Sequence, residues 1–240
     1  MKIKLLVGLL IIAQSCLATA GDLAYITNEK DDNISVIDLQ KQKVVKEIPV
    51  GQRPRGIILN HDQSLAYICA SDSDRIQILD LNTEEIVGEL PSGEDPETIA
   101  LHPNGKIIYT SNEDDAILTV IDIASSQVIA QIEVGVEPEG LAVSPDGKIV
   151  VVTSETTNMV HWIDTKTNEI IANTLVGARP RSVQFTQDNQ LLWVSSEIGG
   201  DVVVIDVASK EIIKEFNFTI RGIHRDRVQP VGIVLSRDGQ

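Results

Sequence analysis

Hydrophobic residues fall into many short runs along the chain, and turn-forming residues separate these runs. The runs are rich in Val and Ile, and Gly, Pro, Asn and Asp stand between them. A helical repeat needs longer runs with apolar residues three and four positions apart, whereas short β-branched runs between turns are typical of strands. The pattern therefore predicts an all-β chain.

The same pattern recurs every 42 residues. The repeat is clearest in an aspartate that ends the runs ISVID, IQILD, LTVID, VHWID and VVVID, namely Asp38, Asp80, Asp122, Asp164 and Asp206. Periods near 40 with several short strands per unit are typical of propeller blades, because each small sheet buries both faces against its neighbours. We therefore expect a β-propeller of four-stranded blades.

One unit predicts four strands, which we call A to D. In the second unit these are Gly56 to Asn60, Leu65 to Ala70, Arg75 to Asp80 and Ile86 to Leu90. The A-to-B turn recurs as HPNGK, SPDGK and TQDNQ, which supply Gly or Asn where a tight hairpin needs positive φ. The repeated aspartate after strand C is expected to cap the C-to-D turn by accepting backbone N–H bonds, and not to act in catalysis.

The first 20 residues predict a secretory signal, which makes the protein exported and periplasmic. Lys2 and Lys4 precede an apolar run from Leu5 to Ala13, and Ala18-Thr19-Ala20 has the small-x-small pattern of a cleavage site. A retained membrane helix is the weaker interpretation, because the run is shorter than the roughly 20 residues that span a bilayer. Lipidation at Cys16 is a further alternative.

Charge and composition exclude some classes of function. The net charge is −15, which disfavours nucleic acid as a partner. Aromatic residues make up only 3% of the chain, too few for stacking platforms. Without Cys16, Cys69 is the remaining cysteine, so we expect no internal disulfide and a buried thiol.

The repeats divide the propeller domain, residues 21–240, into units 23–64, 65–106, 107–148, 149–190 and 191–240. The chain is expected to begin with strands B, C and D of one blade, to complete four blades, and to end after an A strand at Val231 to Ser236. An A strand without its hairpin partner is an exposed edge, so we expect a C-terminally truncated piece of a longer ring. The alternative is a closed five-bladed ring in which this last strand completes the first blade.

Several segments resemble a known class of repeat protein. The segments LAYITNEKDDNISVID, IPVGQRPRG, AVSPDGKIVVVTSETTNMVHWID and SSEIGGDVVVID resemble the YVTN-type β-propeller repeat. More narrowly, the chain from about Ala24 onward resembles the β-propeller proteins associated with pyrroloquinoline-quinone (PQQ)-dependent catabolism. This resemblance implies seven blades, a periplasmic location and an accessory role beside a quinoprotein dehydrogenase or its cytochrome. It implies no catalytic residue and no cofactor site.

In a propeller the D-to-A and B-to-C loops lie on one face around the axis, and we call this the loop face. Two D-to-A loops carry arginines beside the repeated proline and two carry acids, which predicts ligand-binding or partner-binding candidates at Arg53, Arg55, Arg179, Arg181, Glu97 and Glu139. The alternative is that these arginines pair with neighbouring acids and hold the blades together. The B-to-C loops add a ring of acids at Glu29, Glu113, Glu155 and Glu197. We expect this ring to steer a cationic partner, and we expect no metal there because equivalent loops lie far apart.

The fifth unit contains an eight-residue insertion, since Pro180 and Pro230 are 50 residues apart instead of 42. It concentrates basic residues at Arg221, His224, Arg225 and Arg227. One interpretation is a solvated loop. The other is a recognition loop for a carboxylate-bearing molecule or an acidic protein surface.

The chain carries no motif that predicts catalysis. Haem-attachment, phosphate-loop, zinc-protease and nucleophile-elbow motifs are missing, and the four histidines form no cluster. Met159 and His161 are expected to pack between blades instead of binding copper. The sequence therefore favours a non-catalytic periplasmic binding or scaffold protein without a cofactor; bound quinone is a weaker possibility. The main alternative is a metal-assisted, lactonase-like hydrolase that uses Glu97, Glu139 and Glu155.

Overall fold

The computed structural model describes residues 22–236, so the predicted signal segment and the last turn lie outside the described residues. These residues form one three-stranded and four four-stranded sheets, all antiparallel between sequence neighbours. The first sheet comprises β1 (Leu23–Asn28), β2 (Asn33–Asp38) and β3 (Lys43–Pro49). The second comprises β4 (Pro54–Leu59), β5 (Leu65–Ala70), β6 (Arg75–Asp80) and β7 (Glu85–Pro91).

The other three sheets repeat the second one. The third comprises β8 (Pro96–Leu101), β9 (Ile107–Asn112), β10 (Ile117–Asp122) and β11 (Gln127–Glu133). The fourth comprises β12 (Pro138–Val143), β13 (Ile149–Ser154), β14 (Met159–Asp164) and β15 (Glu169–Leu175). The fifth comprises β16 (Pro180–Phe185), β17 (Leu191–Ser196), β18 (Asp201–Asp206) and β19 (Ile212–Asn217). Among the described residues the only helical turns are η1 (Ser71–Ser73) and η2 (Arg225–Arg227).

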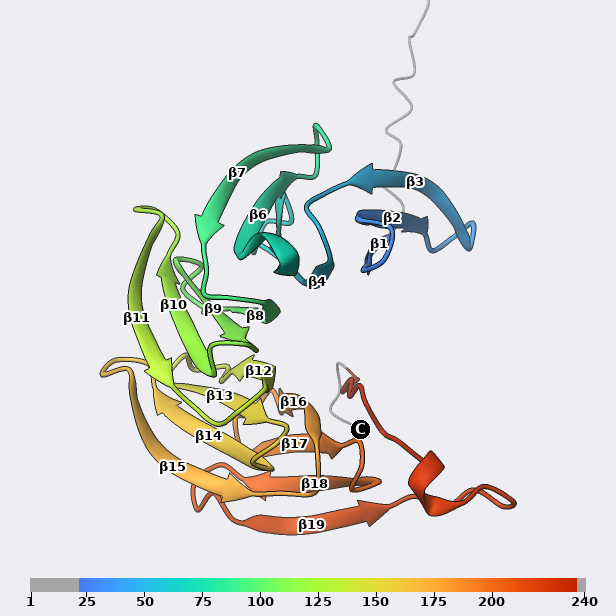
Figure 1. The fold of residues 1–240 in the computed structure, drawn as a ribbon, viewed down its shortest axis with the longest axis vertical. Helices are drawn as coiled ribbons and strands as arrows, with labels where there is room; N and C mark the ends of the chain where they lie inside the picture. Colours follow the sequence, from blue (N-terminus) through green and yellow to red (C-terminus); the bar gives the residue numbers. More distant parts are fainter. Residues whose placement is uncertain (1–21, 237–240) are drawn as a thin grey trace, which may run out of the picture.

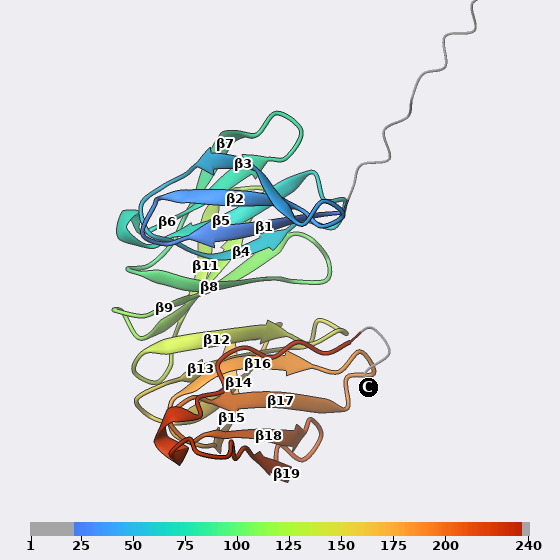
Figure 2. The same cartoon turned by 90° about the vertical axis from the view of Figure 1, so that its right-hand side faces the viewer.

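The five sheets follow one another round an arc like the blades of a propeller (Figure 1). In each four-stranded sheet the first strand lies on the inner side of the arc and the fourth strand on the outer side. Figure 2 shows the same sheets from the side. The all-β prediction and the order A to D within one unit are therefore confirmed. No helix within residues 22–236 is long and apolar enough to cross a membrane.

Strand boundaries agree closely with the 42-residue pattern. β5 and β6 begin and end at the predicted residues, whereas β4 begins at Pro54, two residues before the predicted start. Pro54 pairs with Ala70 before a register shift that precedes Ile57. A proline is tolerated at the first position of a strand, where its missing N–H breaks no ladder bond.

The hydrophobic core lies between neighbouring sheets. One cluster joins Tyr67, Cys69 and Leu90 of the second sheet to Ile108 and Ile121 of the third. Strands B and C are therefore packed on both faces, which explains why they read as continuous apolar runs instead of alternating ones. Cys69 is fully buried, as predicted, and burial raises the pKa of its thiol to about 12.

The repeated aspartates cap the C-to-D turns as predicted. Asp80 Oδ1 accepts the N–H groups of Asn82 and Thr83 at 2.7 and 3.0 Å. Asp164 Oδ1 accepts the N–H groups of Lys166 and Thr167, both at 2.9 Å. The other three aspartates each accept one backbone N–H group, in the turns after Asp38, Asp122 and Asp206. These bonds favour the carboxylate and lower the pKa of Asp80, Asp164 and Asp206. For Asp38 and Asp122 the side-chain hydrogen bonds of Lys41 and Ser125 lower the pKa most, and the backbone bonds add to them.

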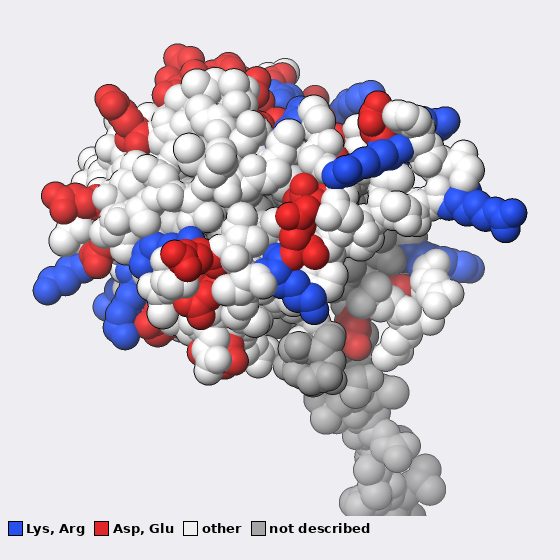
Figure 3. All heavy atoms as spheres, turned by 90° about the horizontal axis from the view of Figure 1, so that it is seen from below, with Lys and Arg blue, Asp and Glu red and all other residues white. Residues whose placement is uncertain are grey.

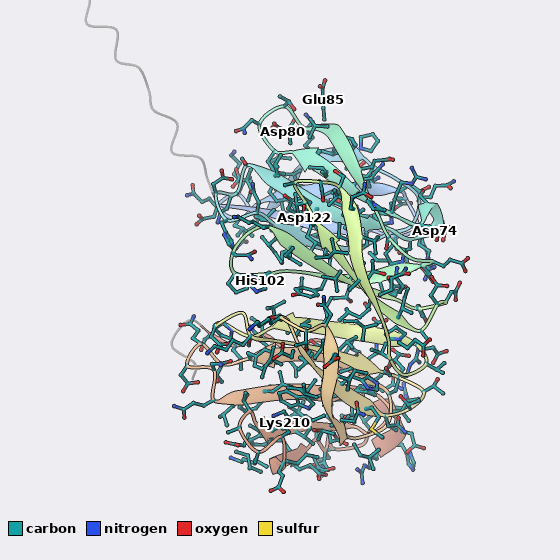
Figure 4. The ribbon with its side chains drawn as sticks, turned by 90° about the vertical axis from the view of Figure 1, so that its left-hand side faces the viewer. Asp74, Asp80, Glu85, His102, Asp122 and Lys210 are labelled. Carbon is teal, nitrogen blue, oxygen red and sulfur yellow. The ribbon has the colours of Figure 1, made fainter. Side chains whose placement is uncertain are left out.

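The A-to-B turns lie at the opposite end of the strands from the B-to-C loops. Figure 4 shows this with His102, in an A-to-B turn, and Asp74, in a B-to-C loop. Gly105 and Gly147 hold φ at +70° and +72°, as the sequence predicts for tight hairpins. His102 Nε2 lies 2.9 Å from the carbonyl oxygen of Gly147 in the next sheet. These turns therefore also join neighbouring blades.

The predicted A strand at Val231 to Ser236 is not a strand in the structure. We call these residues the inner segment. Side chains of the fifth sheet hold it: Ser195 Oγ donates to the carbonyl of Val231, and the N–H of Leu235 donates to Gln184 Oε1. Side-chain groups of β16 and β17 are the described partners of Val231, Ile233 and Leu235, so these residues lie against the fifth sheet without joining a strand ladder. The closed five-bladed ring is also wrong, because β1 is the edge of a three-stranded sheet and does not pair with the inner segment.

Asp164 tests the turn caps. We expect Asp164→Ala to lower the thermal midpoint at pH 6 more than Asp164→Asn, which keeps an acceptor oxygen. Since the folded-state pKa of Asp164 is lowered, its contribution is complete above the unfolded value of about 3.9 and is lost as the pH falls through the folded value. Thermal melts from pH 6 to pH 2 measure this, and a gap between wild type and Asp164→Ala that widens on acidification would contradict the assignment.

Candidate functional site

The D-to-A and B-to-C loops meet on one face of the arc, and side chains of the B-to-C loops fasten the D-to-A loops. Asp32 Oδ1 accepts the N–H of Arg53 at 2.8 Å, and Asp74 Oδ1 accepts the N–H of Asp95 at 3.0 Å. Asn158 Oδ1 accepts the N–H of Arg179 at 3.1 Å. Sequence analysis did not single out these anchoring residues, although Asp32, Asp74 and Asn158 follow the 42-residue spacing.

The residue before each repeated proline has a left-handed backbone. Arg53, Asp95, Glu137 and Arg179 have φ between 49° and 58°. The right-handed helical region is disfavoured for a residue before proline, and a left-handed conformation is uncommon for residues with a Cβ. For Arg53, Asp95 and Arg179 the anchoring bonds support this conformation, which fixes where their side chains lie.

These loops build one continuous network of ion pairs, which we call the mouth network. Its basic members are the four predicted arginines, Arg53, Arg55, Arg179 and Arg181. Its acidic members are Glu29, Asp72, Asp95, Glu97, Glu139, Glu155 and Glu197. The network includes residues of all five sheets and their loops, so it links every blade of the described chain.

In the first half of the network, two arginines of the second blade hold acids of the third. Arg53 contacts both oxygens of Asp95, at 2.9 and 3.0 Å, and donates to Glu97 Oε1 at 3.0 Å. Arg55 contacts the other oxygen of Glu97 and reaches back to Glu29 at 3.1 Å. The side chain of Glu97 is only 1% exposed, so its carboxylate is buried beneath partly exposed guanidinium groups.

In the second half, two arginines of the fifth blade hold acids of the fourth. Arg179 Nε lies 2.6 Å from Glu155, and Arg181 contacts the other oxygen of the same carboxylate. Glu139 connects the two halves, because its Oε1 lies 3.1 Å from Arg181 and 3.7 Å from Arg55. The arginines and acids that alternate between blades in the sequence therefore pair across blade boundaries.

Acids outnumber bases in the mouth network, and this changes the proton affinity of its most buried member. Burial, followed by repulsion from Glu139, raises the pKa of Glu97 to about 8, and the attraction of Arg55 offsets only part of this. Burial also raises the pKa of Glu139. The carboxyl of Glu97 therefore takes up a proton more readily than an ordinary glutamate, and that proton would relieve part of the repulsion among the carboxylates.

Glu113 lies beside the network. One oxygen each of Asp95, Glu97 and Glu113 come within 4.8 Å of one another, so these three side chains are the candidate metal ligands among the described residues. Arg53 already contacts Asp95 and Glu97. A guanidinium therefore occupies part of the position that a metal ion would need.

The inserted loop follows β19 on the same face. Arg225, in η2, donates to Asn217 Oδ1 at 3.0 Å and to the carbonyl of Gly199, in a B-to-C loop, at 3.3 Å. His224 lies 3.3 Å from Asp226. The side chains of Arg221 and Arg227 are exposed. Arg225 thus fastens the loop, whereas Arg221 and Arg227 are displayed at its surface.

Apolar side chains accompany these cations. Phe218, Ile220 and Ile223 are between 40% and 56% exposed. Phe218 and Ile220 line a shallow groove with Arg227 and Pro230. Figure 3, which views the molecule from the side of the fifth sheet, shows basic and acidic side chains interspersed. The loop therefore combines exposed cations with exposed apolar surface in an acidic protein.

His161 and Met159 lie in β14, in the interior of the fourth blade. His161 Nε2 accepts the N–H of Gly135 at 3.0 Å, and its Nδ1 lies 2.7 Å from Asn173 Oδ1. Burial lowers the pKa of this histidine. Nε2 therefore fastens a D-to-A loop to strand C, and Nδ1 contacts strand D of the same blade, which sequence analysis did not predict.

Comparisons with known proteins place the chain in a family and show a related fold. The model of the family described as "Domain of unknown function (DUF5074)" matches residues 9–233. No curated protein matches the sequence. Among solved structures, Kuenenia stuttgartiensis hydrazine synthase is similar, with a TM-score of 0.72 and 22% sequence identity over 79% of this chain. The match spans 61% of that protein's chain. At this identity the likeness concerns the fold alone.

Glu97 gives a pH test of the mouth network. Because its folded-state pKa is raised, the folded chain binds this proton more tightly than the unfolded chain, whose glutamate pKa is about 4.3. Its stabilising contribution is present below about pH 4.3 and is lost as the pH rises through about 8. We expect the free energy of unfolding of wild type, relative to Glu97→Gln, to fall by about 4 kcal/mol from pH 5 to pH 8.

Urea unfolding at several pH values measures this difference. Glu89→Gln is the matched control, because Glu89 lies on the surface and its hydrogen bond from Arg75 lowers its pKa. Its contribution does not fall over the same pH range. A flat or rising difference for Glu97→Gln would show that Glu97 is a carboxylate throughout.

Proposed function

The chain belongs to the DUF5074 family, whose shared domain has no known function, and we propose that it is a non-catalytic binding or scaffold protein. The inserted loop at Phe218 to Arg227 is the proposed recognition element. One observation carries this proposal: the mouth arginines are engaged in ion pairs, whereas Arg221 and Arg227 are exposed beside apolar side chains on the loop face. Insertions on a rigid repeat scaffold are common positions for binding.

The mouth network has a structural role in this proposal. Its four arginines hold neighbouring blades together, so they are unavailable for a ligand unless the network opens. Breaking one partner out of a buried ion pair typically costs about 3–5 kcal/mol. A ligand that took an arginine out of the network would have to offset that free energy in addition to its other binding costs. The network therefore positions the loops and presents a negative surface, and recognition falls to the inserted loop.

The proposed context is the periplasm, in an accessory role to PQQ-dependent alcohol catabolism. Two features of the sequence support it: the signal-like first 20 residues and the resemblance of the repeats to propellers associated with that catabolism. The proposed partner is a quinoprotein dehydrogenase or its cytochrome. An acidic patch on that partner fits Arg221 and Arg227, and exposed apolar side chains add contact area beside them.

A charge-matched pair of double variants tests the recognition loop. We expect Arg221→Ala/Arg227→Ala to weaken capture of the partner from periplasmic extract at least tenfold. Lys106→Ala/Lys148→Ala removes the same charge from exposed A-to-B turns on the opposite face, and we expect it to leave capture unchanged. If both double variants weakened capture of the partner equally, or if neither did, the loop would be solvated surface and not a recognition element.

The metal-assisted hydrolase is a second candidate because Asp95, Glu97 and Glu113 lie close together. The ion pairs of Arg53 with two of these acids favour the binding protein instead. Calorimetric titration of the purified chain with Ca²⁺ and Zn²⁺ distinguishes the two. We expect no stoichiometric binding. A bound equivalent of metal that Glu113→Gln abolishes would support the hydrolase.

A further inference from the structure

The D-to-A loop at Gly135 to Glu137 connects the third and fourth blades and is held differently from the equivalent loops. In those loops a B-to-C side chain accepts the N–H of the residue before the proline: Asp32 for Arg53, Asp74 for Asp95 and Asn158 for Arg179. For Glu137 this repeat position is Ala116, whose side chain has no acceptor. A different group therefore anchors this loop.

That group is the imidazole of His161, in β14. Its Nε2 accepts the N–H of Gly135 at 3.0 Å, and within residues 22–236 it is the one side-chain acceptor for a backbone N–H of this loop. The loop packs closely at this point, because a Cβ at Gly135 would lie 2.7 Å from Ser154 Cβ. One side-chain bond thus fastens the start of the loop to the fourth blade.

The contacts of the ring define the protonation state that this bond requires. Nε2 must be unprotonated to accept a backbone N–H, so the proton of the neutral ring is on Nδ1 and points to Asn173 Oδ1, 2.7 Å away. A second proton goes to Nε2, where it would face the N–H of Gly135, donor against donor. Ser154 Oγ lies 3.0 Å from Nε2 and can accept this proton instead. Protonation therefore exchanges the bond to Gly135 for one to Ser154.

The second blade has the same arrangement with an acceptor that does not titrate. Gln77 occupies the repeat position of His161, and its Oε1 accepts the N–H of Gly51, the equivalent of Gly135, at 2.6 Å. The Gln77 amide also donates to strand D of its blade, at 3.3 Å to Glu89. A glutamine at this position therefore makes the same bond to the loop at any pH.

Burial lowers the pKa of His161, and the bond to Asn173 offsets part of this shift. The carboxylates on the surrounding elements do not add to it: they belong to Glu133 in β11, Glu137, Glu155 and Glu169 in β15, and Glu137 and Glu155 are bonded to Thr156 and to two arginines. Because the folded-state pKa is lowered, the contribution of the neutral ring to stability is present above the unfolded value of about 6.5. It is lost as the pH falls through the folded value.

We propose that His161 is a pH-sensitive latch, and that protonation of its imidazole releases Gly135 and loosens residues 135–137 where the third and fourth blades meet. Two backbone bonds at the ends of the loop do not involve the ring, from Val134 N–H to the Ala116 carbonyl at 3.0 Å and from Glu155 N–H to the Glu137 carbonyl at 2.9 Å. The opening is therefore local, and the blades stay packed. Acidification changes the loop face at this junction and leaves the loop at Gly51 closed.

Amide hydrogen exchange tests this proposal by comparing two equivalent glycines in one wild-type sample. NMR measures the protection factors of Gly135 and Gly51 from pH 7.5 to pH 4, and the ring resonances of His161 report its protonation. We expect the protection factor of Gly135 to fall at least tenfold as His161 takes up its proton, while that of Gly51 changes less than twofold. A general loss of stability at low pH would lower both protection factors together.

His161→Gln is the matched variant, because glutamine already makes this bond in the second blade. We expect Gly135 in this variant to keep its protection over the whole pH range. His61→Gln removes an exposed histidine from an A-to-B turn and is the control, in which Gly135 responds to pH as in wild type. If His161→Gln does not fold, the two glycines of the wild-type chain still give the answer.

Three results overturn the proposal. In the first, Gly135 and Gly51 of the wild-type chain lose protection in parallel, or Gly135 loses it equally in folded His161→Gln. In the second, Gly135 keeps its protection while His161 takes up a proton. In the third, the imidazole stays neutral down to pH 4 in the folded chain.

Discussion

Packing between neighbouring sheets is the interaction on which this structure depends. A four-stranded sheet with both faces apolar is stable only when sheets on either side cover it. Close contact on the inner side of the arc makes this possible: a Cβ at Gly140 would lie 2.7 Å from the carbonyl oxygen of Arg181 in the next sheet. Because every unit packs in the same way, loops 42 residues apart in the sequence meet on one face.

The meeting of these loops on one face determines which charged residues form ion pairs. The D-to-A loops bring arginines of one blade to acids of the next, and the buried carboxylates of Glu97 and Glu155 are enclosed by guanidinium groups. Buried pairs of this kind contribute to the specific arrangement of the blades and are poor ligands for outside molecules. Binding is therefore better assigned to groups the packing leaves exposed, such as Arg227 on the inserted loop.

The repeat made the fold predictable, and it made only part of the site predictable. Strand order, the turn caps at Asp80 and Asp164 and the burial of Cys69 follow from local patterns, which the sequence carries directly. The partners of Arg55 and Arg181 depend on how adjacent sheets are placed, and no local pattern contains that information. The same limit explains why the sequence did not predict that Arg225 fastens its loop by bonding to Gly199. It also explains the wrong prediction of a strand in the inner segment, because strand propensity alone does not supply a strand to pair with.

The central claim is that the mouth network joins separate blades through specific ion pairs. A double-mutant cycle between Arg181, in β16 of the fifth blade, and Glu155, in the loop after β13 of the fourth, tests it most directly. Urea unfolding of wild type, Arg181→Met, Glu155→Gln and the double variant gives the coupling free energy. The account predicts a favourable coupling of about 1–3 kcal/mol. Additive effects, with a coupling near zero, would contradict it.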